Sequence, residues 1–137
     1  VIYVTHDQEE AMYLSDRIIL LDQGKIIQSG TCKELYLSPK NKMVANFLGE
    51  CNFITLEDGR NITIRPESFE VSDRKTSENG IEITIKDLVF LGGNTKLIGS
   101  YNQQEITATF RSTDLNPNIG KLDKVYLHYT KKCLINL

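Results

Sequence analysis

The pattern of apolar and polar positions divides the chain into two parts with different periodicities. In residues 1–50, short continuous apolar runs such as residues 1–4 and 18–21 alternate with stretches whose apolar residues recur at helical spacing. Continuous apolar runs are expected for strands buried on both faces, and helical spacing is expected for amphipathic helices. From residue 51 onward apolar residues alternate with polar ones, which is typical of strands. The pattern predicts an α/β segment followed by an all-β domain.

Three helices are predicted in the first part, each from a residue that can cap an N-terminus. Asp7 and Thr31 each precede a glutamate by three residues, Glu10 and Glu34, so both positions are candidate capping boxes. Asn41 can cap the third helix through its side-chain oxygen.

Strands account for most of the remaining pattern. Residues 17–21 and 25–29 are predicted to pair as a hairpin across a turn of sequence DQGK. Residues 73–80 lack apolar anchors and are expected to form a mobile loop. Many short strands separated by turn residues indicate a small barrel or sandwich. The strands predicted after residue 50 are residues 53–56, 62–64, 70–71, 81–91, 96–101, 105–111, 125–129 and 134–137.

Composition and charge are those of a folded chain without a dominant charged face. Hydrophobic residues make up 40% and charged residues 25%, which argues against a disordered chain. Sixteen Lys+Arg against 18 Asp+Glu leave a net charge of -2, so no broad basic surface is available for nucleic acid or an anionic membrane. The longest apolar runs, such as residues 18–21, are far shorter than the roughly 20 residues that span a bilayer.

The cysteines indicate neither a disulfide framework nor a metal site. Cys32, Cys51 and Cys133 form no C-x-x-C motif, and their number is odd. The only histidines are His6 and His128, so the sequence predicts no zinc site. His128 alternates with apolar neighbours and is predicted to be an ordinary sheet residue.

The most specific segment is YVTHDQEEAM, residues 3–12. It resembles the switch-histidine motif of ABC transporter ATPases, especially importers of the maltose, polyamine and ferric-iron type. The resemblance implies that His6 is a catalytic and nucleotide-binding residue, which senses the γ-phosphate of ATP and positions the attacking water. Without the surrounding motif, His6 would be interpreted as a residue capping a helix. Asp7 is predicted to be a helix cap, and Glu9 and Glu10 to be solvated first-turn residues favoured by the helix dipole.

The resemblance extends through the rest of the chain. The sequences SDRI (15–18) and QGKI (23–26) look like the strand pair that closes the ATPase domain. FLGE (47–50) looks like the exit into a TOBE domain, a transport-associated OB fold, and IRPE (64–67) and FLG (90–92) are typical of that domain. The fold implied is an α/β remnant of a P-loop ABC ATPase domain over residues 1–50, followed by an all-β, OB-like TOBE barrel with a regulatory role over residues 51–137. Cys32 and Cys51 depart from the usual residues at their positions.

The family's phosphate-binding parts do not occur in this sequence. No G-x-x-x-x-G-K-[ST] motif is present, and the family places that motif, the Walker B carboxylate and the signature motif before the switch histidine. We therefore expect a C-terminal fragment of an importer's ATP-hydrolysing subunit that hydrolyses no ATP alone. ATP and Mg²⁺ belong to the full-length parent, and no cofactor or metal is expected in this fragment.

The same resemblance implies partners, a location and a cargo. A second copy of the ATPase subunit and the membrane permease subunits are the expected partners, on the cytoplasmic face of the cell membrane. The sequence GECNF (49–53) is most similar to polyamine importers, so spermidine or putrescine is the expected cargo. Iron and maltose importers share much of this pattern and remain alternatives.

Two further functions compete with this interpretation. TOBE-like modules can sense oxyanions such as molybdate, although only one module is evident here. OB folds can bind nucleic acid, and seven aromatic residues follow residue 50, but the charges of residues 51–137 cancel. Arg65 either pairs with a carboxylate or lines a regulatory site. Residues 1–4 are expected to be the cut edge of a larger sheet, either poorly ordered or covered by another copy of the chain.

Overall fold

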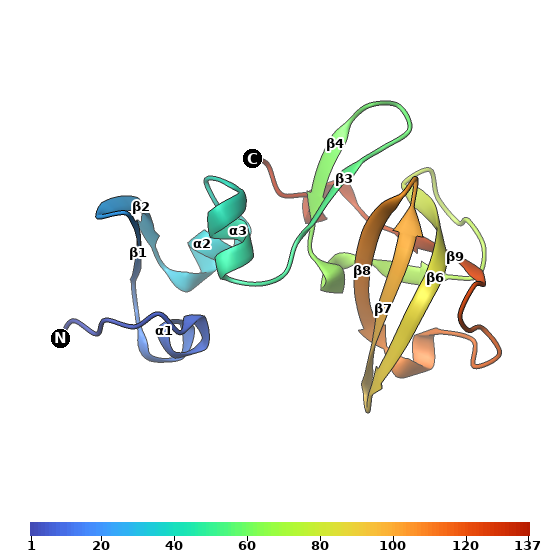
Figure 1. The fold of residues 1–137 in the computed structure, drawn as a ribbon, viewed down its shortest axis with the longest axis horizontal. Coiled ribbons are helices and arrows are strands. Elements are labelled where there is room, and N and C mark those ends of the chain that lie inside the picture. The colour runs from blue at the N-terminus through green and yellow to red at the C-terminus, as the bar shows by residue number, and fades with distance from the viewer. The chain divides into compact units, whose positions relative to one another are not determined.

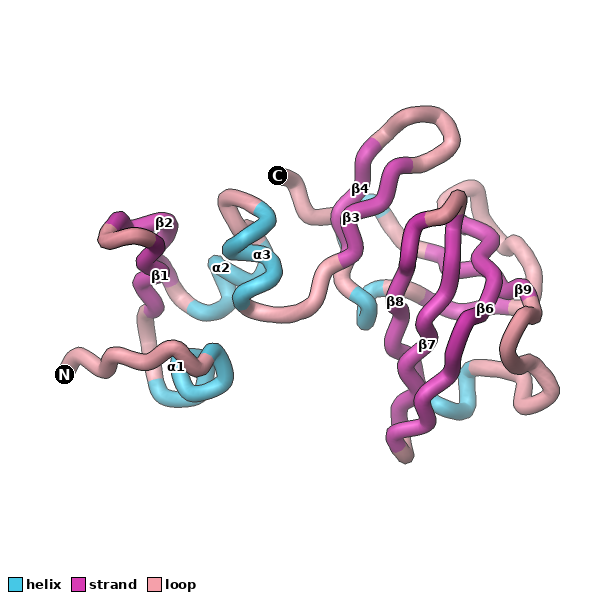
Figure 2. The backbone as a smooth tube through the Cα atoms, in the orientation of Figure 1, coloured by secondary structure: helices cyan, strands magenta, loops and turns pink.

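The computed structural model describes residues 1–137, which divide into two compact units (Figure 1). The first, here called the N-terminal unit, comprises Val1–Cys51 with Ile135–Leu137. The second, here called the β unit, comprises Asn52–Leu134. Strands dominate the chain and helices are few and short, as the tube in Figure 2 shows. None of the helices is long and apolar enough to cross a membrane.

The N-terminal unit contains three short helices and one hairpin. Its elements are α1 (Gln8–Leu14), β1 (Ile18–Asp22), β2 (Lys25–Gly30), α2 (Cys32–Leu37) and α3 (Lys42–Phe47). The antiparallel pairing of β1 with β2 confirms the predicted hairpin. A small buried cluster holds the unit together, formed by Ile18, Leu35, Val44 and Leu48.

The predicted helix starts are confirmed. The side chains of Asp7, Thr31 and Asn41 accept hydrogen bonds from backbone N–H groups of the first turns of α1, α2 and α3. Thr31 and Glu34 form a reciprocal capping box, as the sequence predicts. These caps satisfy N–H groups that have no partner within a helix.

Several apolar runs do not form the buried strands that the sequence predicts. Residues 1–4 form no strand and are exposed, because no strand of the described chain lies beside them to complete a hydrogen-bonded ladder. In β1 only Ile18 is buried, whereas Ile19 and Leu21 are exposed. Residues 134–137 also form no strand. The prediction of strands buried on both faces is therefore wrong within this chain.

The β unit consists of a two-stranded and a five-stranded antiparallel sheet. β3 (Asn52–Thr55) pairs with β4 (Asn61–Ile64), and the larger sheet has the order β5-β9-β6-β7-β8. Figure 1 shows this larger sheet curled into a half-barrel, which is compatible with a small OB-like barrel. Its strands are β5 (Glu70–Ser72), β6 (Gly80–Leu91), β7 (Asn94–Tyr101), β8 (Gln104–Arg111) and β9 (Lys124–His128), with single 3₁₀ turns at η1 (Pro66–Ser68), η2 (Ser112–Asp114) and η3 (Lys131–Cys133).

The core of the β unit lies on the inner face of the curl. Ile81, Ile83 and Ile85 alternate with polar residues along β6 and are buried, as the two-residue period predicts. Gly99 on β7 leaves room for this packing, since a Cβ there would lie 2.8 Å from Cδ1 of Ile83. Further buried members are Ile54, Ile64, Phe69, Leu97, Tyr101, Ile106, Phe110, Val125, Leu127 and Tyr129.

Two amide side chains tie β3 to β8 where the structure assigns no strand pairing. The Asn52 amide accepts from Thr107 N and donates to Thr107 O, both at 2.8 Å. The Gln104 amide accepts from Thr55 N and donates to Thr55 O, also both at 2.8 Å. Each side-chain amide thus makes the two hydrogen bonds, one donated and one accepted, that a backbone residue of a neighbouring strand would make. These bonds attach the β3–β4 hairpin to the edge of the larger sheet.

We expect Asn52→Ala to destabilise the β unit by about 1–3 kcal/mol, because it leaves both buried backbone groups of Thr107 without their partner. Gln104→Ala removes the same chemistry at the more exposed Thr55 and is expected to cost less, since water can replace the amide. Urea unfolding followed by circular dichroism measures both losses. Equal losses for the two variants would contradict the importance of burial here.

Candidate functional site

The segment that carries the most specific motif is well defined locally. His6 is exposed and directly precedes Asp7, the N-cap of α1. Oδ1 of Asp7 accepts from the backbone N of Glu9 at 2.9 Å and of Glu10 at 3.2 Å. Asp7 is thus engaged as a helix cap, and Glu9 and Glu10 are exposed in the first turn, as the sequence predicts.

Glu10 does not complete the predicted capping box with Asp7. Its Oε2 instead accepts from the Thr5 hydroxyl at 2.9 Å and from the Tyr3 hydroxyl at 3.3 Å. The backbone N of Asp7, which a capping box would use, donates to Oγ1 of Thr5 at 3.0 Å. The capping-box prediction at Asp7 is wrong because the Thr5 hydroxyl takes the place of the glutamate.

The imidazole of His6 is available for chemistry outside this chain. It is solvent-exposed, and no hydrogen bond or ion pair within the chain engages it. A neutral imidazole can donate from one ring nitrogen and accept at the other. His6 can therefore contact a phosphate oxygen and a water molecule at the same time, which is the pair of contacts that its motif implies.

The structure brings no metal-binding set together. No group of three or more His, Cys, Asp or Glu side chains is close enough to hold an ion. His128 lies buried on β9, where its Nε2 accepts from the backbone N of Thr76 at 2.9 Å. Arg65 is only 2% exposed at the start of η1. A buried guanidinium requires polar partners inside the fold, which favours the structural interpretation of Arg65.

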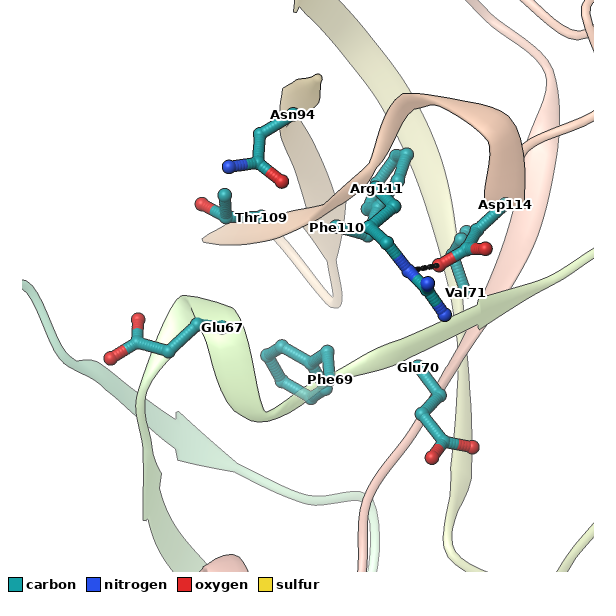
Figure 3. A pocket seen from close by; sticks show the side chains of 9 residues that line it. All are labelled: Glu67, Phe69, Glu70, Val71, Asn94, Thr109, Phe110, Arg111 and Asp114. Atoms are coloured by element: carbon teal, nitrogen blue, oxygen red, sulfur yellow. Dashed lines mark ion pairs between the residues drawn. The ribbon is translucent and has the colours of Figure 1, made fainter.

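A groove in the β unit was not predicted from the sequence. It lies between η1 with β5 on one side and β8 with η2 on the other (Figure 3). Its volume is about 580 Å³. Phe69 and Phe110 give it apolar walls, and Glu67 and Glu70 add carboxylates. Arg111 and Asp114 form an exposed ion pair at its rim, with Nε 3.8 Å from Oδ2.

The groove could not be predicted because its lining comes from separate segments of the chain. Phe69 and Phe110 are both buried, and the alternating pattern of the sequence does not show that they lie together. That pattern gives no information about which residues of η1 and η2 flank them. The lining residues are Glu67, Phe69, Glu70, Val71, Asn94, Thr109, Phe110, Arg111 and Asp114.

A second surface cluster joins β6 to β9. The Tyr126 hydroxyl donates to Oε2 of Glu82 at 2.7 Å, and Nζ of Lys124 lies 3.6 Å from Oε1. The hydrogen bond from Tyr126, with a smaller effect of Lys124, lowers the pKa of Glu82 below its ordinary value. The same hydrogen bond raises the pKa of Tyr126.

These pKa shifts determine in which direction the stability of the folded state changes with pH. Because the pKa of Glu82 is lower in the folded state, its contribution to stability is present above the unfolded pKa and is lost as pH falls through the folded pKa. We expect Tyr126→Phe to raise the pKa of Glu82 toward its ordinary value, measured by a ¹³C NMR titration of the carboxyl carbon. Tyr13→Phe, at an exposed tyrosine of α1, is the matched control and is expected to change nothing. An unchanged pKa in Tyr126→Phe would contradict the assigned cause.

The chain is similar in sequence to parts of known proteins. No known family model matches the chain. A spermidine/putrescine import ATP-binding protein PotA of Bacillus thuringiensis subsp. konkukian is 36% identical over 141 residues, covering 99% of this chain. The chain is a homologue of part of that protein. A PotA protein of Mycoplasma capricolum is 42% identical over 118 residues, covering 80% of this chain.

The similarity covers most of this chain but less than half of each relative. The chain spans 42% of the length of the Bacillus protein and 32% of that of the Mycoplasma protein. These relatives confirm the resemblance to ATP-binding subunits of polyamine importers that the sequence predicts, and the partial coverage agrees with a C-terminal piece of such a subunit.

Proposed function

We propose that this chain is the C-terminal part of the ATP-hydrolysing subunit of an ABC importer for spermidine and putrescine. The observation that carries the proposal is the 36% identity over 99% of the chain to a spermidine/putrescine import ATP-binding protein. The motif of residues 3–12 lies within this similarity and adds a chemical reason for it. The same relatives favour polyamines over iron or maltose as the cargo.

His6 is the proposed catalytic and nucleotide-binding residue. ATP with Mg²⁺ supplies the γ-phosphate in the complete protein, where other segments hold it. One ring nitrogen of His6 donates to an oxygen of that phosphate, and the other orients the attacking water. The exposed ring, which makes no hydrogen bond or ion pair within the chain, supports this role. Asp7 contributes indirectly, because it begins α1 immediately after the histidine.

The two units take different parts in this proposal. Residues 1–50 are the end of the α/β ATPase domain, and residues 51–137 are an OB-like TOBE domain with a regulatory role. The curled antiparallel sheet of the β unit supports the second assignment. The partners are a second copy of the subunit and the membrane permease, which hold the protein at the cytoplasmic face of the membrane.

The test compares ATP hydrolysis by the 137-residue chain with hydrolysis by the complete polypeptide. We expect turnover from the complete polypeptide and none from the chain alone, because its sequence has no P-loop motif. A His6→Ala chain purified in the same way reports any contaminating ATPase. Turnover by the pure chain that His6→Ala removes, or a complete polypeptide that hydrolyses no ATP, would contradict the proposal.

A further inference from the structure

The backbone on both sides of His6 is held by side-chain hydrogen bonds. On one side, the half-buried Thr5 donates to Oε2 of Glu10 at 2.9 Å. On the other side, the backbone N of Asp7 donates back to Oγ1 of Thr5 at 3.0 Å. Asp7 is also fixed to the first turn of α1 through the backbone N of Glu9. His6 is the single residue between these two attachments.

The Thr5 hydroxyl is the centre of this arrangement because it donates and accepts at once. Its proton is directed to the Glu10 carboxylate, which leaves its lone pairs free for Asp7 N–H. A hydrogen bond to an ionised carboxylate is stronger than one between neutral groups. The Tyr3 hydroxyl, 3.3 Å from the same Oε2, adds a second donor. Glu10 therefore connects α1 to the residues that precede His6.

We propose that Glu10, acting through Thr5, is a positioning residue for His6. The inference rests on the proposed function of His6, because it concerns where that imidazole stands relative to the phosphate. Glu10 makes no hydrogen bond or ion pair with the His6 ring. Its effect is to restrict the backbone at His6, so that the ring is presented from a fixed point at the start of α1. Catalysis depends steeply on such placement, and an error of about 1 Å can cost on the order of 100-fold in rate.

Glu9→Ala is a matched control for the loss of a negative charge and for any effect of alanine on α1. Glu9 is exposed, lies in the same first turn, and only its backbone N is used in the capping of α1. Glu9→Ala and Glu10→Ala therefore remove the same charge from the same helix end. Only Glu10→Ala removes the acceptor of the Thr5 hydroxyl. Glu10→Gln keeps a side-chain oxygen, and Thr5→Ser keeps the hydroxyl that Thr5→Val removes.

The first measurement is amide hydrogen exchange at Asp7 in this chain. Exchange is expected to be several-fold faster in Thr5→Val and Glu10→Ala than in the unmodified chain, Thr5→Ser, Glu10→Gln and Glu9→Ala. Circular dichroism shows whether each variant stays folded, and the conservative variants keep the test valid if one does not. Equal Asp7 exchange in Glu10→Ala and Glu9→Ala would overturn the proposed attachment.

The second measurement is the steady-state kinetics of ATP hydrolysis by the complete protein. Glu10→Ala and Thr5→Val are expected to lower kcat by about 10- to 100-fold with little change in KM for ATP, and Glu10→Gln and Thr5→Ser to restore most of it. If His6→Ala has no effect, the proposed function of His6 is wrong. If His6→Ala removes activity but Glu10→Ala behaves like Glu9→Ala, the proposed function stands and the positioning role of Glu10 is overturned.

Discussion

Replacement of His6 by alanine is expected to lower the rate of ATP hydrolysis by the complete protein by about 100-fold or more. The reason is that, in the role proposed for it, the imidazole supplies a donor to the developing charge on the phosphate and an acceptor that orients water, and loss of one such donor costs about 10²–10³-fold in kcat. The loss should appear in kcat, because alanine removes contacts that matter most in the transition state. Steady-state ATPase kinetics measure the change.

Lys25→Ala is the control for the His6 experiment. Lys25 lies exposed at the turn between β1 and β2, and its replacement is expected to leave hydrolysis unchanged. Retention of more than half the activity by His6→Ala would contradict the catalytic role of His6. Loss of activity in both variants would show that the effect of His6→Ala is not specific to the imidazole.

Leu127→Ala is expected to destabilise the β unit by about 2–5 kcal/mol, because it leaves a cavity in a closely packed core. Leu127 is 0% exposed on β9, where it lies between Val71 on β5 and Ile81 on β6. A loss of this size is a large part of the stability of an ordinary domain, about 5–15 kcal/mol. Urea unfolding followed by circular dichroism measures it.

Leu91 supplies the matched control for Leu127. The same residue type is 63% exposed at the end of β6, so Leu91→Ala is expected to change stability by no more than about 0.5 kcal/mol. Similar losses of stability for the two leucine variants would contradict the placement of Leu127 in the core and of Leu91 at the surface. A loss only for Leu127→Ala agrees with the described packing.

Local signals in the sequence predict most of the elements. The caps at Asp7, Thr31 and Asn41 are local, since each depends on one side chain and the turn that follows it, and all three form. The two-residue period of β6 predicts the buried face of Ile81, Ile83 and Ile85 for the same reason. Such features require no knowledge of distant residues.

Features that depend on distant residues are the ones that the sequence does not predict. Apolar residues 1–4 have the composition of a buried strand but form none, because a strand needs a neighbour. The attachment of Asn52 to Thr107 joins residues 55 positions apart and has no local signature. The groove beside Phe69 and Phe110 depends on how η1 and η2 flank the sheet.

The candidate site shows the same division. The motif of residues 3–12 identifies His6 by resemblance, and the cap at Asp7 follows from the sequence. The sequence alone assigns Glu10 to a capping box, because a glutamate at that spacing usually turns back to the helix start. The neighbouring Thr5 hydroxyl competes for that role and redirects Glu10.

We propose above that the complete protein drives polyamine import. It is tested most directly by uptake of radiolabelled spermidine into cells that lack their own polyamine importer and express the complete protein with its permease. We expect spermidine uptake that falls in the presence of excess putrescine, that maltose and ferric ion leave unchanged, and that is lost in His6→Ala. Absence of spermidine uptake in cells where the same proteins restore import of maltose or ferric iron would contradict it.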